Sequence, residues 1–153
     1  MMTTGDRVQE IVSALRRRDW LPSEAERQTA ASLIHRRRTL MDHLDQQPDT
    51  PATLEEGMRI QQELADQILG EVLPEARSVL GTSPVVDLID AYVAALRAMA
   101  PYAKKLRPLR GPEGALTEYD VLTPQDREAM HDAWAPIIAA GSVLGAVASG
   151  DVN

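Results

Sequence analysis

The fold is decided by residues 83–106, which read SPVVDLIDAYVAALRAMAPYAKKL. Apolar residues recur here at alternating steps of four and three: Val85, Ile89, Tyr92, Leu96, Met99, Ala103 and Leu106. This spacing predicts a helix with one apolar stripe, as in the seam of a helix bundle. A second face of the same helix carries four alanines: Ala91, Ala94, Ala95 and Ala98. Their small size favours close approach of another helix and a central position in the bundle. We expect Pro101 to bend this helix.

Four helix-start signals divide the chain. Two of them fit the capping box, Ser23 with Glu26 and Thr53 with Glu56. The other two place a hydroxyl before a proline, at Ser83–Pro84 and at Thr123–Pro124. They predict long helices over 24–46, 54–81, 84–106 and 124–149. A shorter amphipathic segment predicts a helix over 6–18, and residues 47–51 are read as a linker.

Two residues interrupt the third predicted helix. Gly70 weakens it, and Pro74 removes a backbone hydrogen bond and clashes with the carbonyl four residues earlier. We therefore expect a kink or a break at this point.

The sequence thus predicts an all-α fold, a bundle of four long helices plus a short N-terminal helix, in a single domain over residues 1–153. The ends, 1–5 and 150–153, are expected to be frayed, and 108–122 to form a long loop. The chain is 44% hydrophobic but contains no Phe, so its core has to be built from aliphatic residues, Ala and Met. That composition suits helix–helix packing better than a β-sandwich.

Composition also excludes some chemistry. The chain has no Cys, which rules out disulfides, thiol catalysis and thiolate metal sites. Its net charge of −7 is uneven: residues 1–40 carry eight Arg against five acidic residues, whereas the remainder is strongly acidic. An acidic body repels phosphate and disfavours general nucleic-acid binding. The preference for Arg over Lys suggests a bacterial source, and without an apolar leader pattern at residues 1–20 we expect a cytoplasmic protein.

No charged residue occurs between Trp134 and Gly150, and Gly141 and Gly145 form a pair of small residues one helical turn apart. Three interpretations remain open. We favour the most buried helix of the bundle. The second is a partner-binding face on which a smooth helix packs against another copy. The third, a membrane span, is disfavoured because the stretch is at the lower length limit and contains Pro136.

Two basic runs lie on the first two helices, at 16–18 and 35–38. Consecutive helical residues point in different directions, so we interpret these runs mainly as a solvated face. The alternative is a patch for an acidic partner, a phosphorylated ligand or, least favoured, nucleic acid, and four residues would form it: Arg16, Arg17, Arg36 and Arg37.

The long loop is the other candidate site. Arg107 and Arg110 precede or begin it, and Tyr119 and Asp120 lie near its end. These four residues could contact a small ligand if the loop covers the mouth of the bundle. The simpler interpretation is that the loop plugs the end of the core.

Catalytic and metal motifs are weak. Glu128 and His131 have the Glu-x-x-His spacing of di-iron bundles, but the motif occurs once instead of twice. His35 and His43 form no triad that spacing can support. We therefore predict no catalytic residues, no metal and no cofactor.

The leading functional hypothesis is a non-enzymatic interaction protein, such as an adaptor, assembly or regulatory subunit, that binds a protein partner or a second copy of itself. The alternative is a small-molecule-binding bundle or small enzyme whose pocket is covered by residues 108–122.

Overall fold

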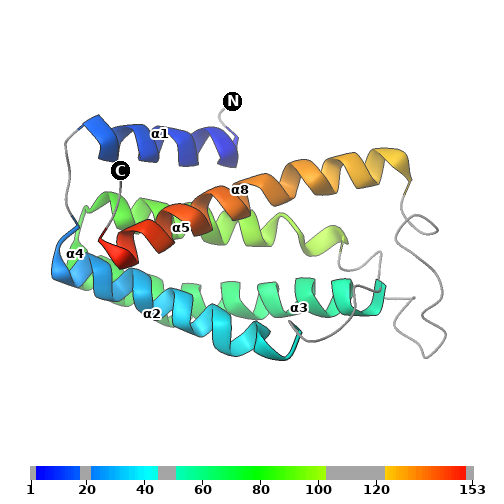
Figure 1. The fold of residues 1–153 in the computed structure, drawn as a ribbon, viewed down its shortest axis with the longest axis horizontal. Coiled ribbons are helices and arrows are strands. Elements are labelled where there is room, and N and C mark those ends of the chain that lie inside the picture. Colours follow the sequence, from blue (N-terminus) through cyan, green and yellow to red (C-terminus); the bar gives the residue numbers. More distant parts are fainter. Residues whose placement is uncertain (1–2, 18–21, 45–50, 103–122, 151–153) are drawn as a thin grey trace.

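The computed structural model describes residues 3–17, 22–44, 51–102 and 123–150, and every regular element in these ranges is helical (Figure 1). The α-helices are α1 (Thr4–Arg17), α2 (Glu24–Met41), α3 (Pro51–Gln67), α4 (Leu73–Leu80), α5 (Pro84–Arg97) and α8 (Pro124–Ser149). A π-helical turn, Ile68–Val72, joins α3 to α4, and a short 3₁₀ turn, Asp42–Leu44, follows α2. The predicted all-α bundle with a shorter N-terminal helix is confirmed.

Helix α5 forms the centre of the bundle. It packs against α1, α3, α4 and α8, and nine of its fourteen residues are buried. Ile89, Leu96 and Met99 are fully buried, as the apolar stripe predicts. On the alanine face Ala91 and Ala95 are buried, but Ala94 and Ala98 are exposed. The closely packed face is therefore narrower than predicted.

Three of the four predicted helix starts are confirmed. Ser23 and Glu26 form a complete capping box at α2, and Thr123 forms another with Asp126 at α8. At α5 the Ser83 hydroxyl accepts a hydrogen bond from the Val85 amide at 3.1 Å. Each of these signals is local, so it is readable from the sequence alone.

One buried carboxylate links two of these starts. Oε1 of Glu26 accepts a hydrogen bond from the Ser23 amide at 2.8 Å, and its Oε2 accepts one from the Ser83 hydroxyl at 2.5 Å. Because the same hydroxyl also caps α5, Glu26 fixes the beginning of α2 against the beginning of α5.

The predicted start at Thr53 is wrong. Helix α3 begins at Pro51, which the sequence analysis had placed in a linker, so Thr53 lies inside the helix. Proline is favoured at the first helical position because its missing N–H has no partner there in any case. Thr50–Pro51 repeats the hydroxyl–proline pattern of the confirmed starts and is the signal that was overlooked.

Helix α1 also begins earlier than predicted, at Thr4. The Thr3 hydroxyl accepts a hydrogen bond from the Asp6 amide at 3.0 Å, and the Asp6 carboxylate accepts one from the Thr3 amide at 3.2 Å. This reciprocal pair starts the helix two residues before the predicted position.

The expected interruption near Pro74 takes the form of the π-turn. The Leu73 amide donates to the carbonyl of Ile68, five residues back, so the helix widens by one residue just before the proline. Helix α4 then ends at Gly81, whose positive φ of 62° suits a residue without a side chain. Helix α5 stops at Arg97, four residues before Pro101, and Ala98–Met99 form a turn.

Helix α8 does not have the burial predicted for it. It was expected to be the most buried helix, yet only five of its 26 residues are buried: Met130, Ile137, Ala140, Leu144 and Val147. Its most apolar 18-residue window is 22% buried, and by length and composition alone α8 could cross a membrane. Helix α8 packs against α1, α2 and α5, but only these five residues are buried in the contacts. The absence of charge therefore marks an apolar surface that is largely on the outside of the bundle.

Candidate ligand-binding groove

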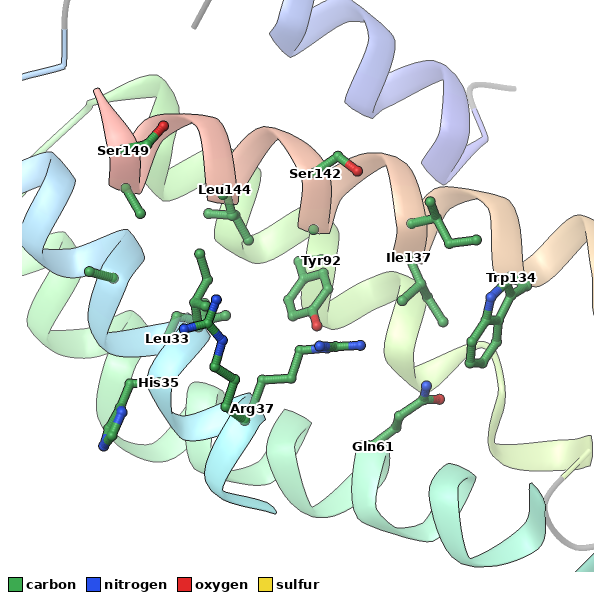
Figure 2. Close-up of a pocket in the computed structure, with 17 residues that line it drawn as sticks. Leu33, His35, Arg37, Gln61, Tyr92, Trp134, Ile137, Ser142, Leu144 and Ser149 are labelled. Atoms are coloured by element: carbon green, nitrogen blue, oxygen red, sulfur yellow. The ribbon is translucent and has the colours of Figure 1, made fainter. Parts of the chain in front are cut away.

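A groove of about 620 Å³ lies between α2 and α8 and reaches down to α3 and α5 (Figure 2). Helix α2 supplies one side of it, including His35, Arg37 and Arg38. Helix α8 supplies the other side, from Trp134 to Ser149. This volume lies within the range of small-molecule sites, about 300–1,000 Å³.

Three polar side chains from three helices converge at the floor of this groove. Figure 2 shows the Arg37 guanidinium beneath the Tyr92 hydroxyl, and the Gln61 amide pointing into the same space. Arg37 is exposed, whereas Tyr92 and Gln61 are 2% and 4% exposed. The groove therefore combines a solvent-facing cation with two groups that are otherwise shielded from water.

Arg37 and Tyr92 interact directly. Burial raises the pKa of the Tyr92 hydroxyl above 10.0, and the charge and hydrogen bond of Arg37 offset part of this rise. The phenol consequently remains protonated at neutral pH and can donate a hydrogen bond.

Gln61 has an unsatisfied buried atom. Its Oε1 has no hydrogen-bond partner among the described residues. A buried acceptor without a partner costs about 1–3 kcal/mol. Since the side chain lines the groove, a bound molecule with an N–H or O–H group could supply the missing donor if the amide turns its oxygen toward the groove.

The charge of the lining is one-sided. Its side chains include three basic residues, His35, Arg37 and Arg38, and none of the described residues that line it is acidic. The salt bridges found in the described part of the chain leave Arg37 and Arg38 without an acidic partner. In a protein of net charge −7, this groove favours anions.

The opposite wall is apolar and open. Trp134 and Ile138 are 37% and 56% exposed, and both line the groove. Gly141 and Gly145 lie on the same wall. A Cβ atom at Gly145 would meet nothing within 4 Å, so the absence of a side chain there contributes directly to the open space.

The four basic residues proposed from the sequence have different surroundings in the structure. Arg36 bonds to Glu71 at 2.5 Å and to Gln67 at 3.4 Å, which ties α2 to the π-turn and α3. Arg37 instead lines the groove. Arg16 is exposed on α1, and Arg17 is the last residue of that helix.

The predicted loop site lies in a part of the chain that the structure does not describe. Arg107, Arg110, Tyr119 and Asp120 lie outside the described residues, as does the whole segment 108–122. On α8, Glu128 and His131 are both exposed. Within the described ranges no three His, Asp or Glu side chains come together as metal ligands.

Three residues proposed from the sequence lie in this groove. Arg37, Gly141 and Gly145 were named as candidates for partner binding, and all three line it. Tyr92 was assigned to the core only, and Gln61 was not identified as a site residue. The available signal is that Gln61 is a polar residue among the apolar positions Leu54, Met58, Ala65, Ile68 and Val72 of the third predicted helix.

Comparison of the chain with known protein families, curated proteins and solved structures found no match. Fold and site together define an all-α helical bundle with a one-sidedly basic groove.

Proposed function

We propose that this protein is a non-enzymatic binding protein whose recognition site is the α2–α8 groove. The observation that carries the proposal is the convergence of Arg37, Tyr92 and Gln61 below an uncharged wall. A mostly apolar pocket with a few convergent polar groups is typical of small-molecule sites.

The chemistry of the three groups supports binding over catalysis. Arginine keeps its proton under all ordinary conditions, and the amide of Gln61 does not titrate. Burial raises the pKa of Tyr92, so its hydroxyl is a poor base at neutral pH. These groups can hold and orient a ligand, but none of them exchanges a proton readily at neutral pH.

The groove can be tested by filling it. Gly145→Leu adds a side chain on the groove wall, at a position where a Cβ atom would meet no described atom within 4 Å. Gly70→Leu is the matched control, because a Cβ there also meets nothing within 4 Å and Gly70 does not line the groove. The probe is anilinonaphthalene sulfonate, an amphipathic anion that fluoresces in apolar sites.

We expect wild type and Gly70→Leu to bind the probe equally and Gly145→Leu to lose binding. Trp20→Phe leaves Trp134 as the sole tryptophan, so its emission should change on binding in the groove. Equal probe binding by all variants, with no change in Trp134 emission, would reject the groove as the site.

The exposed apolar wall of α8 favours a second candidate, docking of a protein partner or a second copy of this chain. Trp134 and Ile138 would be covered in such a complex, and the protein would act as an adaptor, assembly or regulatory subunit. Light scattering distinguishes the two functions: a dimer that Ile138→Glu converts to a monomer supports self-association, and a monomer in both cases excludes it.

A further inference from the structure

We propose that the α2–α8 groove takes an amphipathic organic anion that carries a hydroxyl or N–H group close to its carboxylate, as in a β-hydroxy fatty acid. This inference rests on the proposed function and specifies its ligand. It follows from three features of the lining: a basic side, an uncharged side and an unpaired buried acceptor.

The basic side chains of the groove indicate that the ligand carries an anionic group. Arg37 presents several N–H donors at the groove floor, and the neutral Tyr92 hydroxyl can add another donor beside it. A carboxylate accepts from both, and hydrogen bonds between ionised partners are shorter and stronger than neutral ones. His35 and Arg38 lie on the same side, whereas an ammonium group would meet no acidic side chain among the lining residues that the structure describes.

The uncharged wall formed by α8 indicates that the rest of the ligand is apolar. From Trp134 to Ala148 the groove wall follows fourteen helical steps, a length of about 21 Å at 1.5 Å per residue. This wall has no charged side chain, and the apolar side chains of Trp134 and Ile138 are exposed on it. An alkyl chain lying along it would remove apolar surface of both molecules from water.

The unpaired acceptor of Gln61 indicates that the ligand also carries a hydrogen-bond donor. Its Oε1 is buried and lacks a donor among the described residues, and a carboxylate cannot supply one. Because this oxygen is itself closed off from solvent, a ligand hydroxyl next to the carboxylate reaches it once the Gln61 amide turns its oxygen into the groove. The acceptor therefore selects a hydroxylated acid over the plain acid.

The concave shape favours a dissolved amphiphile over a membrane surface. Tyr92 and Gln61 lie at the bottom of the groove and are almost completely buried, so a flat bilayer would not contact them. A single extended ligand could.

The test compares four ligands of one chain length by isothermal titration calorimetry with the full chain: β-hydroxydecanoate, decanoate, decanol and decylammonium. We expect decanoate to bind about tenfold to a hundredfold more tightly than decanol, the range of a hydrogen bond to a charged group. Decylammonium should not bind measurably. β-Hydroxydecanoate should bind about threefold to tenfold more tightly than decanoate, as for one neutral hydrogen bond.

Two variants assign these differences to residues. Arg37→Gln should remove the preference for decanoate over decanol. Gln61→Met should equalise β-hydroxydecanoate and decanoate without weakening decanoate. Unchanged preferences in either variant would contradict the proposed contact.

The outcomes separate this inference from the proposed function. If decanol or decylammonium binds as well as decanoate, and Gly145→Leu abolishes that binding, the groove is a ligand site but the ligand class is wrong. If none of the four binds and Gly145→Leu leaves probe binding intact, both proposals fail. Sedimentation with phosphatidylglycerol vesicles that decanoate does not reverse would assign the face to a membrane and overturn the inference.

Discussion

Gln61→Met should make the unliganded protein more stable, although most substitutions in a protein interior destabilise it. The side chain is 4% exposed, and its Oε1 has no partner among the described residues. Methionine is unbranched and of similar length, so it can follow the same path, and a near-isosteric change of this kind costs less than about 1.5 kcal/mol in packing.

The magnitude follows from the unpaired acceptor. Removing it recovers about 1–3 kcal/mol of desolvation cost. After a modest packing cost, we expect the free energy of unfolding to rise by about 1 kcal/mol. For a domain of this size that corresponds to a melting temperature about 2–4 °C higher.

The neighbouring glutamine provides the control. Gln62 also has a buried Oε1 without a partner among the described residues, but its Nε2 donates to the Leu96 carbonyl at 2.6 Å and so ties α3 to the end of α5. Gln62→Met loses this bond and should be about 1 kcal/mol less stable than Gln61→Met.

Urea unfolding followed by circular dichroism gives both values on the same scale. A Gln61→Met variant less stable than wild type would refute the reasoning, because it would mean that Gln61 contributes to the fold and is not held there at a cost.

Three further predictions concern the bundle itself. Glu26→Ala should cost about 1–3 kcal/mol, and a double-mutant cycle with Ser83→Ala should give a coupling energy of about 0.5 kcal/mol or more, since one carboxylate joins both helix starts; additive effects in urea unfolding would contradict the link. The raised pKa of Tyr92 means that the folded state holds this proton more tightly than the unfolded state, so its contribution to stability is complete below pH 10.0 and is lost as the pH rises through the folded pKa. The free energy of unfolding, measured by urea titration at increasing alkaline pH, should therefore fall more steeply with pH in wild type than in Tyr92→Phe. Equal pH dependence in the two proteins would contradict a raised pKa of Tyr92. Leu96→Ala removes a fully buried side chain of α5 and should cost about 2–5 kcal/mol, whereas Val79→Ala, at a 58% exposed position, should change stability by less than about 0.5 kcal/mol; calorimetric melting of both variants checks this contrast.

The features that the sequence predicted correctly are local ones. The stripe through Ile89 and Leu96 requires only the helical repeat, and the caps at Ser23 and Thr123 require only four consecutive residues. At the third helix two local signals compete. The capping box of Thr53 and Glu56 predicts a start at Leu54, whereas the Thr50–Pro51 pair predicts a start three residues earlier, and the helix begins at Pro51.

The groove depends on tertiary arrangement, which a repeat does not specify. Arg37, Gln61 and Tyr92 lie on α2, α3 and α5, and only the rotation and crossing of these helices bring their ends together. The exposure of α8 was missed for a related reason. An uncharged helix can be covered by its own bundle or can present an apolar surface to a ligand or partner, and composition is the same in both cases.

The most direct test of the ligand-binding groove is a crystal structure of the protein with β-hydroxydecanoate. We predict the carboxylate within hydrogen-bond distance of the Arg37 guanidinium, the hydroxyl donating to Oε1 of Gln61, and the alkyl chain along Trp134 and Ile138 of α8. A groove filled by residues 103–122 or by a second copy of the chain, with the fatty acid absent or bound elsewhere, would contradict it.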